Sequence, residues 1–296
     1  MARVVVVHGI NSTYGGPGSM AQVWVPGLLD GVGLAGYGGR LAVGDIGCVF
    51  YGDVFRRSGR LLGEDEASVL SAEDVDGDEA AWLAAWWQHA SEVDPTVIPP
   101  GRRTLGGVGG VQAALAALAG SKFLAGVGEG LLILWLKQVK AYFTRPEVRE
   151  KIQHRFAEAI GCDTEVVVAH SLGSVVAYEA LCAHPDWPVA RLVTLGSPLA
   201  IRNMILDRLT PKPSRCEGRW RGMWPGGVGA WVNIADRIDF VALVKTLAPT
   251  FGASVVDVEI NNGVRLHDVR RYLSAAETGK AVIDPAGLAV GMGRDE

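Results

Sequence analysis

The sequence has few cysteines, and none of them stands at the spacing of a metal site or a redox motif. The four are Cys48, Cys162, Cys182 and Cys216, and no two of them form a CxxC pair. Because three of them lie in or beside apolar segments, we expect reduced and mostly buried thiols rather than a disulfide framework. The six histidines are scattered along the chain, so we expect neither a metal site nor another cofactor.

An excess of positive charge is missing as well. The chain carries 28 lysines and arginines against 32 aspartates and glutamates, a formal net charge of −4. This balance excludes a broad basic surface for nucleic acid. Met1-Ala2-Arg3 leads directly into an apolar segment, so no secretory leader is expected. Together with the reduced cysteines, these features predict a cytoplasmic protein.

A hydrophobic run that predicts a membrane span is also absent. Thr104–Ser121 has no charged residue and is long enough to cross a bilayer, but it is rich in glycine and alanine and has no aromatic anchors. Leu131–Leu136 is more apolar but short, and Glu129 precedes it. We therefore expect helices that form a cap over a binding site. Peripheral contact of this cap with lipid stays open.

What the sequence does contain is a series of apolar strand-like segments separated by helix-like ones. The length of 296 residues suits a single α/β domain. The strand-like segments are Val4–Val7, Ile46–Tyr51, Val166–Val168, Leu192–Leu195, Trp231–Ala235 and Val255–Ile260. A further helix is predicted to begin at Pro146, because proline followed by an acidic residue is typical of a first helical turn. The alternation predicts a mostly parallel sheet with helices on both faces and ligands at the carboxyl ends of its strands.

The most informative stretch is EVVVAHSLGSVVAYEAL, Glu165–Leu181. Its three consecutive valines predict a buried strand, and the apolar spacing that follows predicts a helix. Ser171 lies between them on a turn that would expose its hydroxyl at the edge of the sheet. The next backbone N–H would then face a developing oxyanion. The matching segments elsewhere favour this reading over a serine that only caps the helix.

A serine nucleophile needs an imidazole to take its proton, and the imidazole needs an acid to orient it. His267 is the only histidine that follows the possible acids in the chain. Asp236 and Asp239 both come just after the Trp231–Ala235 segment. The residues alone leave open which of the two aspartates is the acid.

Five motifs together resemble the α/β-hydrolase superfamily and, within it, small bacterial lipases and lipase-like serine hydrolases. They are HGIN (8–11), AHSLGS (169–174), LVTLGSPL (192–199), WVNIADRIDFVA (231–242) and LHDVRRYL (266–273). The resemblance covers nearly the whole chain except a middle insertion. Its one departure is Ala169, where the pentapeptide usually has glycine. His170 beside the nucleophile is common in this family and structural, and His8 is expected to orient the HGIN turn.

The resemblance implies an α/β-hydrolase fold and a role for each candidate residue. Ser171 would be the nucleophile, His267 the general base and Asp239 the acid, since the acid of such lipases often precedes an apolar pair. The backbone N–H groups of Ile10 and Leu172 would form the oxyanion hole. No cofactor is implied.

The middle insertion, residues 56–145, is predicted to be a helical cap on a single domain, 1–296, whose core is 1–55 and 146–296. We interpret its acidic stretch Glu64–Glu79 as a solvated loop. The next helix, Ala80–Ala90, carries Trp82 and Trp86 on one face, which is typical of packing. The cap residues expected to line a substrate pocket are Leu115, Leu118, Phe123, Leu124, Leu132 and Trp135. A second irregular segment, Pro211–Gly229, is expected to be a surface loop.

These observations predict a serine hydrolase that cleaves carboxylic esters through an acyl-enzyme, with a small-molecule or lipid ester as substrate. Lipophilic acyl groups should be favoured, at roughly 0.8 kcal/mol per buried methylene. Two alternatives remain. The chain could be a non-enzymatic binding or scaffold protein that retains the hydrolase fold, or a thioesterase or phospholipase acting at lipid surfaces.

Overall fold

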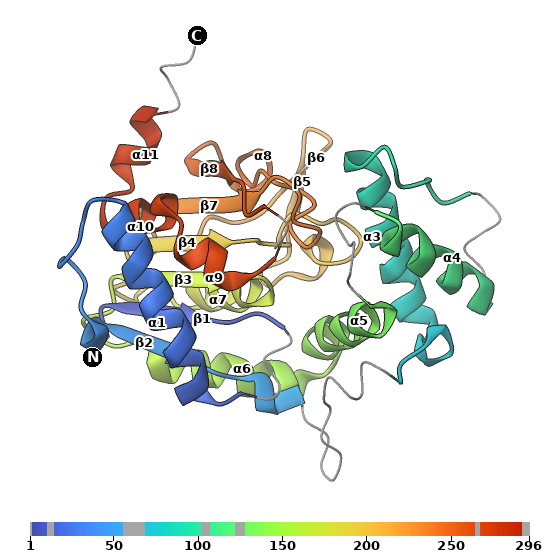
Figure 1. Ribbon diagram of the computed structural model, residues 1–296, viewed down its shortest axis with the longest axis horizontal. Helices are drawn as coiled ribbons and strands as arrows, with labels where there is room; N and C mark the ends of the chain where they lie inside the picture. Colours follow the sequence, from blue (N-terminus) through green and yellow to red (C-terminus); the bar gives the residue numbers. More distant parts are fainter. Residues whose placement is uncertain are drawn as a thin grey trace.

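A parallel β-sheet forms the centre of the protein (Figure 1). The computed structural model describes residues 2–10, 15–55, 69–101, 107–121, 128–263 and 267–291. The strands of the sheet are β1 (Val4–Val7), β2 (Ile46–Val49), β3 (Val166–His170), β4 (Arg191–Leu195), β7 (Ala230–Asp236) and β8 (Val255–Ile260). Their order is β2-β1-β3-β4-β7-β8, and every neighbouring pair is parallel. The predicted α/β fold class is confirmed, and the architecture is compatible with an α/β-hydrolase fold.

Helices cover both faces of the sheet. Those on one face are α1 (Pro17–Leu34), α9 (Val269–Leu273) and α10 (Ala276–Ile283), and those on the other are α6 (Pro146–Ala159) and α7 (Leu172–Ala183). In Figure 1 the first group lies in front of the sheet and the second behind it. Along β1, Val4 and Val6 belong to the first buried layer and Val5 and Val7 to the second. The unbroken valine run is therefore apolar because both of its faces are covered.

The predicted helix at Pro146 begins at that residue. Proline is favourable there because its missing N–H would have no helical acceptor and its fixed φ suits the first turn. The smaller helices are α8 (Ala248–Phe251) and α11 (Ala286–Gly291). Short 3₁₀ turns cover Val43–Asp45, Gly52–Phe55, Ala72–Asp74 and Leu206–Arg208.

The described part of the insertion contains three helices, α3 (Gly77–Val93), α4 (Gly107–Ala119) and α5 (Glu129–Thr144). They gather at one end of the sheet in Figure 1. None of the helices in the described ranges combines the length and the hydropathy that crossing a bilayer requires. The division of the chain into a core and a cap stays a prediction.

The expectation of a solvated acidic loop is wrong for the end of that stretch. The side chain of Asp76 accepts a hydrogen bond from Glu79 N, and the side chain of Glu79 accepts one from Asp76 N. These two bonds form a capping box that starts α3. Glu79 is buried and pairs with Lys137 of α5 at 2.8 Å. The acidic residues here serve a helix start and a packing contact.

Two tryptophans of α3 connect the insertion to the rest of the protein. Trp86 is fully buried, and its Nε1 donates a hydrogen bond to the carbonyl oxygen of Phe240 at 3.0 Å. Its ring also packs against Trp135 of α5, with centroids 4.2 Å apart. Trp82 lies beneath the guanidinium of Arg208 at 4.3 Å. The predicted packing role of these two side chains is confirmed.

The segment Pro211–Gly229 is not irregular throughout. It contains an antiparallel hairpin, β5 (Ser214–Cys216) and β6 (Arg219–Arg221). The turn places Glu217 and Gly218 at positive φ, which glycine tolerates without strain. The strands are too short and too polar to produce a recognisable period-2 pattern, so the sequence did not predict them.

All four cysteines are free thiols, but they are less buried than expected. Cys48 and Cys182 are partly buried, whereas Cys162 and Cys216 are exposed. Cys162 lies in the turn between α6 and β3, and Cys216 ends a hairpin strand. Ile160, near Cys162 in sequence, packs against the core, whereas the Cys162 thiol is exposed.

Candidate active site at the carboxyl ends of the strands

Ser171 occupies a sharp turn between β3 and α7. Its φ of 54° and ψ of −129° lie in a region that a non-glycine residue rarely adopts, and its N–H donates to Leu195 O at 3.0 Å. Leu172 is the first residue of α7, so its N–H has no helical acceptor. Gly173 is required because a Cβ there would lie 2.4 Å from His8 O. The turn thus packs tightly against the end of β1.

Gly9 lies directly against the serine. A Cβ on Gly9 would stand 2.4 Å from Ser171 Cβ and 2.9 Å from Ser171 Oγ, so only glycine fits. Ser171 Oγ is buried and has no hydrogen-bond partner among the described residues. A hydroxyl that is desolvated and unpaired is costly to the fold, and such groups often belong to functional sites.

Asp239 and His267 meet across the turns that follow β7 and β8. His267 Nδ1 lies 2.7 Å from Asp239 Oδ2. An ionised carboxylate can only accept, so Nδ1 carries the proton and Nε2 has the free lone pair. His267 Nε2 is buried and has no partner in the described part of the chain. The imidazole is therefore oriented and available to accept a proton.

The Asp239 carboxylate is held by more than the imidazole. Oδ1 accepts hydrogen bonds from the N–H of Val241 at 2.8 Å and of Ala242 at 3.3 Å. Oδ2 accepts a second bond, from Tyr272 OH at 2.6 Å. Burial alone would raise the pKa of Asp239, but His267 and the other partners outweigh it and lower the pKa to about 2. The group stays ionised at neutral pH.

Asp236, the alternative acid, has a different role. Its side chain accepts backbone hydrogen bonds from Ile238 N at 2.8 Å and from Asn262 N. These bonds brace the ends of β7 and β8. Only Asp239 of the two aspartates contacts His267.

Gly196 lies beneath this pair. Its φ is +54°, and a Cβ there would lie 2.7 Å from Asp239 Oδ2 and 3.0 Å from His267 Cε1. A side chain is therefore excluded both by the backbone conformation and by the space. The glycine after β4 allows the Asp239–His267 pair to approach the sheet edge.

His8 shapes the turn that carries Gly9 and Ile10. Its Nδ1 donates to Gly9 O at 2.5 Å, and its Nε2 accepts from Tyr51 N at 3.0 Å. Tyr51 OH also donates to His8 O at 2.6 Å. Burial lowers the pKa of His8 to about 4, so the ring is neutral, as both bonds require. The expected orienting role of His8 is consistent with these contacts.

His170 packs against the ring of His267, with centroids 4.4 Å apart. Burial, with the nearby His267, holds the pKa of His170 well below its ordinary value. A neutral imidazole there places no positive charge beside His267. Its Nε2 is buried without a hydrogen-bond partner in the described ranges.

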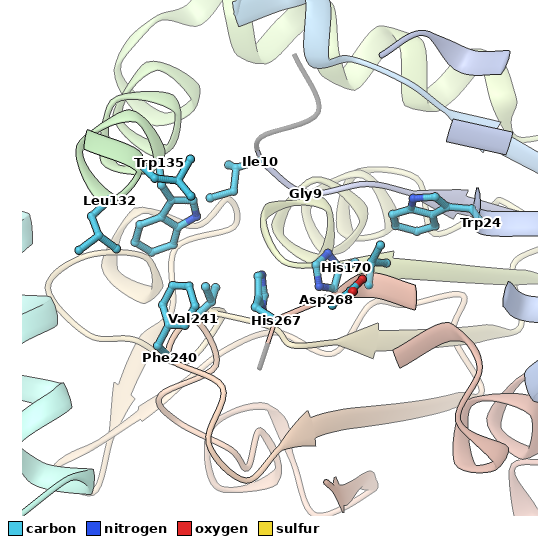
Figure 2. Close-up of a pocket in the computed structure, with 12 residues that line it drawn as sticks. Gly9, Ile10, Trp24, Leu132, Trp135, His170, Phe240, Val241, His267 and Asp268 are labelled. Atoms are coloured by element: carbon cyan, nitrogen blue, oxygen red, sulfur yellow. The ribbon is translucent and has the colours of Figure 1, made fainter. Parts of the chain in front are cut away.

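A cavity of about 310 Å³ lies beside these groups (Figure 2). Its lining comes from the ends of β1 and β3, the Asp239 turn, the His267 segment, α1 and α5. The lining residues are Gly9, Ile10, Trp24, Leu131, Leu132, Trp135, His170, Phe240, Val241, His267, Asp268 and Val269. The cavity reaches His267 and Gly9, while Ser171 lies behind Gly9 and is not part of the lining.

The predicted cap pocket is only partly correct. Leu132 and Trp135 line the cavity, but Leu115 and Leu118 of α4 are fully buried within the core cluster and do not. Helix α4 packs against α3 and α5, and these two leucines are buried in that packing. Phe123 and Leu124 lie outside the described residues, as does Asn11 of the HGIN motif.

No family model matches the chain, and no curated protein matches it.

Within the described ranges, no cluster of three or more histidine, cysteine, aspartate or glutamate side chains is arranged to hold a metal ion. Asp239, His267 and Tyr272 bind one another at the site. Sequence reasoning missed Tyr272 as a partner of Asp239 and Trp135 as a buried donor at the cavity. Gly196 could have been found from the sequence as a site residue, because a glycine directly after a buried strand marks a close approach at the sheet edge. Tyr272 could not, because it reaches the aspartates only when α9 packs against β7.

Proposed function

We propose that this protein is a serine hydrolase of the α/β-hydrolase type that cleaves carboxylic esters through an acyl-enzyme. The observation that carries the proposal is the Asp239–His267 pair. Its Nε2 has no partner among the described residues, and its ring packs against His170, the residue before the strained and equally unpaired Ser171. An oriented imidazole with an unoccupied lone pair is what a serine hydroxyl needs in order to lose its proton.

In the proposed acylation step, Ser171 Oγ attacks the ester carbonyl carbon while its proton passes to His267 Nε2. Asp239 stabilises the resulting imidazolium. The tetrahedral intermediate then expels the alcohol, which takes the proton back from Nε2. In deacylation, a water gives a proton to Nε2 as its oxygen attacks the acyl carbon. The second tetrahedral intermediate then breaks its bond to Ser171 Oγ, which takes the proton from Nε2, so the acid is released and both residues are restored.

The oxyanion of each tetrahedral intermediate would be bound by the N–H groups of Ile10 and Leu172. Neither N–H donates to another group in the described part of the chain. Ile10 lines the cavity, and Leu172 opens α7, whose dipole favours negative charge. Each such donor typically contributes about 3–4 kcal/mol to lowering the barrier.

The cavity lining supports an ester with an uncharged, mainly apolar acyl group. Leu132, Phe240 and Val241 supply aliphatic and aromatic surface, and the lining residues that the structure describes include no lysine or arginine. A volume of about 310 Å³ is near the lower end of small-molecule pockets. Ester turnover should therefore rise with acyl chain length and then stop rising once the cavity is filled.

The decisive experiment compares the wild-type protein with Ser171→Ala, using a fluorophosphonate probe and a chain-length series of 4-nitrophenyl esters. We expect labelling and turnover in the wild type and a loss on the order of 10⁴-fold in turnover for the variant. Circular dichroism and thermal melting would show that the variant is folded.

Equal turnover by the two proteins, in preparations free of contaminating esterase, would falsify the proposal. A wild-type protein that neither labels nor hydrolyses any ester would instead favour a binding or scaffold protein. Rapid turnover of thioesters but not of oxygen esters would move the activity to a thioesterase with the same serine chemistry.

A further inference from the structure

The indole of Trp135 is an unusual wall for an apolar cavity. Trp135 is almost completely buried on α5, and its Nε1 has no hydrogen-bond partner among the described residues. Figure 2 shows the indole nitrogen on the edge of the ring that is turned toward Ile10 and His267. By contrast, the buried Trp86 and Trp87 of α3 both donate to backbone carbonyls.

An N–H that is removed from water without receiving an acceptor weakens the fold. Tryptophan is an obligate donor, so only an acceptor can satisfy it. Phenylalanine would fill similar space without this cost. The unsatisfied donor is therefore explained if the ligand of the cavity brings the acceptor.

We propose that the acyl group of the natural substrate carries a second, uncharged oxygen, such as an ether, hydroxyl or carbonyl oxygen, that accepts a hydrogen bond from Trp135 Nε1. This inference rests on the proposed function and refines its substrate class. It distinguishes the substrate from a plain saturated fatty ester.

The charges around the cavity exclude an anionic acceptor. Among the described residues that line it, Asp268 is the acidic one and none is a lysine or an arginine. Beside these residues, a carboxylate or phosphate on the ligand would be desolvated next to a like charge without a cation to pair with. A neutral oxygen gains the Trp135 hydrogen bond without that penalty.

His170 also lines the cavity, and its Nε2 has no partner among the described residues, but this atom does not discriminate between ligands. A neutral imidazole nitrogen donates or accepts according to its tautomer. It also belongs to the histidine whose ring packs against that of His267. Trp135 is the group whose requirement is unambiguous.

The test is a scan of one oxygen along a fixed acyl chain. The substrates are 4-nitrophenyl hexanoate and its 3-oxa, 4-oxa and 5-oxa analogues, with each kcat/KM divided by the rate constant for hydroxide-catalysed hydrolysis of the same ester. Replacing CH₂ by oxygen makes the chain more hydrated, so a purely apolar cavity would reject every analogue. We expect one oxa position to be preferred over hexanoate by about 10-fold or more.

Trp135→Phe should reduce this preference ratio to about one or below. Trp220→Phe, on the hairpin strand β6 and outside the cavity lining, is the matched control and should keep the wild-type ratio. Preference for the plain chain at every position in the wild type overturns the inference, and so does a preference that survives Trp135→Phe. The wild-type result decides the matter even if Trp135→Phe does not fold.

A binding measurement separates this inference from the proposed function. Calorimetry on Ser171→Ala with the N-methyl amides of the same four acids needs no catalysis. Tighter binding of one oxa amide by about 10-fold, lost in the Ser171→Ala/Trp135→Phe double variant, supports the acceptor even if no ester is hydrolysed. Equal or weaker binding of all three oxa amides overturns it, whatever the esterase activity.

Discussion

At the scale of single residues, the main question is which aspartate supports the imidazole. Asp239 contacts His267, whereas Asp236 binds two backbone N–H groups. We expect Asp239→Asn to lower kcat by about 10³–10⁴-fold, because an amide leaves the imidazole in the wrong tautomer. Asp236→Asn should lower kcat less than about tenfold and mainly reduce stability. Steady-state kinetics and urea unfolding of both variants measure the difference, and a reversed order of the kcat losses would make Asp236 the acid.

Tyr272 is a positioning residue for the same carboxylate. Its hydroxyl donates to Asp239 Oδ2 and accepts from Asp236 N at 2.8 Å, so it links the two aspartates. A hydrogen bond to a charged group contributes about 1.5–3 kcal/mol. Tyr272→Phe should therefore lower kcat by about 10- to 100-fold while KM changes little, since the lost contact acts on the imidazole rather than on substrate.

The control for this prediction is Tyr178→Phe. Tyr178 is equally buried and donates to Met223 O at 3.0 Å, away from the reacting groups. It should lose comparable stability and keep its kcat. If both variants lose kcat in proportion to their stability, Tyr272 has only a structural role.

At the scale of elements, the end of β1 is sensitive to acid through His8. The folded pKa of His8 is about 4, whereas an unfolded histidine titrates near 6.5. Between these values the unfolded state binds more protons, so stability must fall as the pH falls. His8 alone should make the protein about 2 kcal/mol less stable at pH 5 than at pH 7, as measured by urea unfolding.

Urea unfolding of His8→Gln should show a loss of stability between pH 7 and pH 5 that is smaller than the wild-type loss by about 2 kcal/mol, because glutamine has no proton to gain. His154→Gln, at an exposed position on α6, serves as the control and should retain the wild-type dependence. Identical slopes for the wild type and His8→Gln would mean that His8 is already charged, or solvated, in the folded state.

Helix α3 of the insertion contacts the turn that carries Asp239. Trp86 of α3 holds the carbonyl of Phe240, the residue that follows Asp239. The ring of Phe240 lies 5.7 Å from that of His267. A shift of α3 would therefore move Phe240, which is hydrogen-bonded to α3 and whose ring packs near His267.

At the scale of the whole molecule, the sequence predicted what depends on local pattern. Valine runs indicated the buried strands β1 and β3, and the ends of the predicted strands indicated Asp239 and His267, which do meet. The role of Ser171 beside them stays a prediction. Other contacts between distant segments were not predictable. Neither the pairing of Tyr272 with Asp239 nor the burial of Leu115 away from the cavity leaves a signal in sequence spacing, because each depends on how helices pack.

The burial of Ser171 Oγ behind Gly9 has a kinetic consequence. A nucleophile that solvent does not reach reacts only during the intervals in which the structure opens. The rate of inactivation by a bulky phosphonate should then stop increasing at high reagent concentration and level off at the rate constant for opening. A reagent small enough to fit the existing cavity should reach the same limiting rate constant only if Gly9 itself must move. Comparing the limiting rate constants of the two reagents would therefore measure how often the serine becomes accessible.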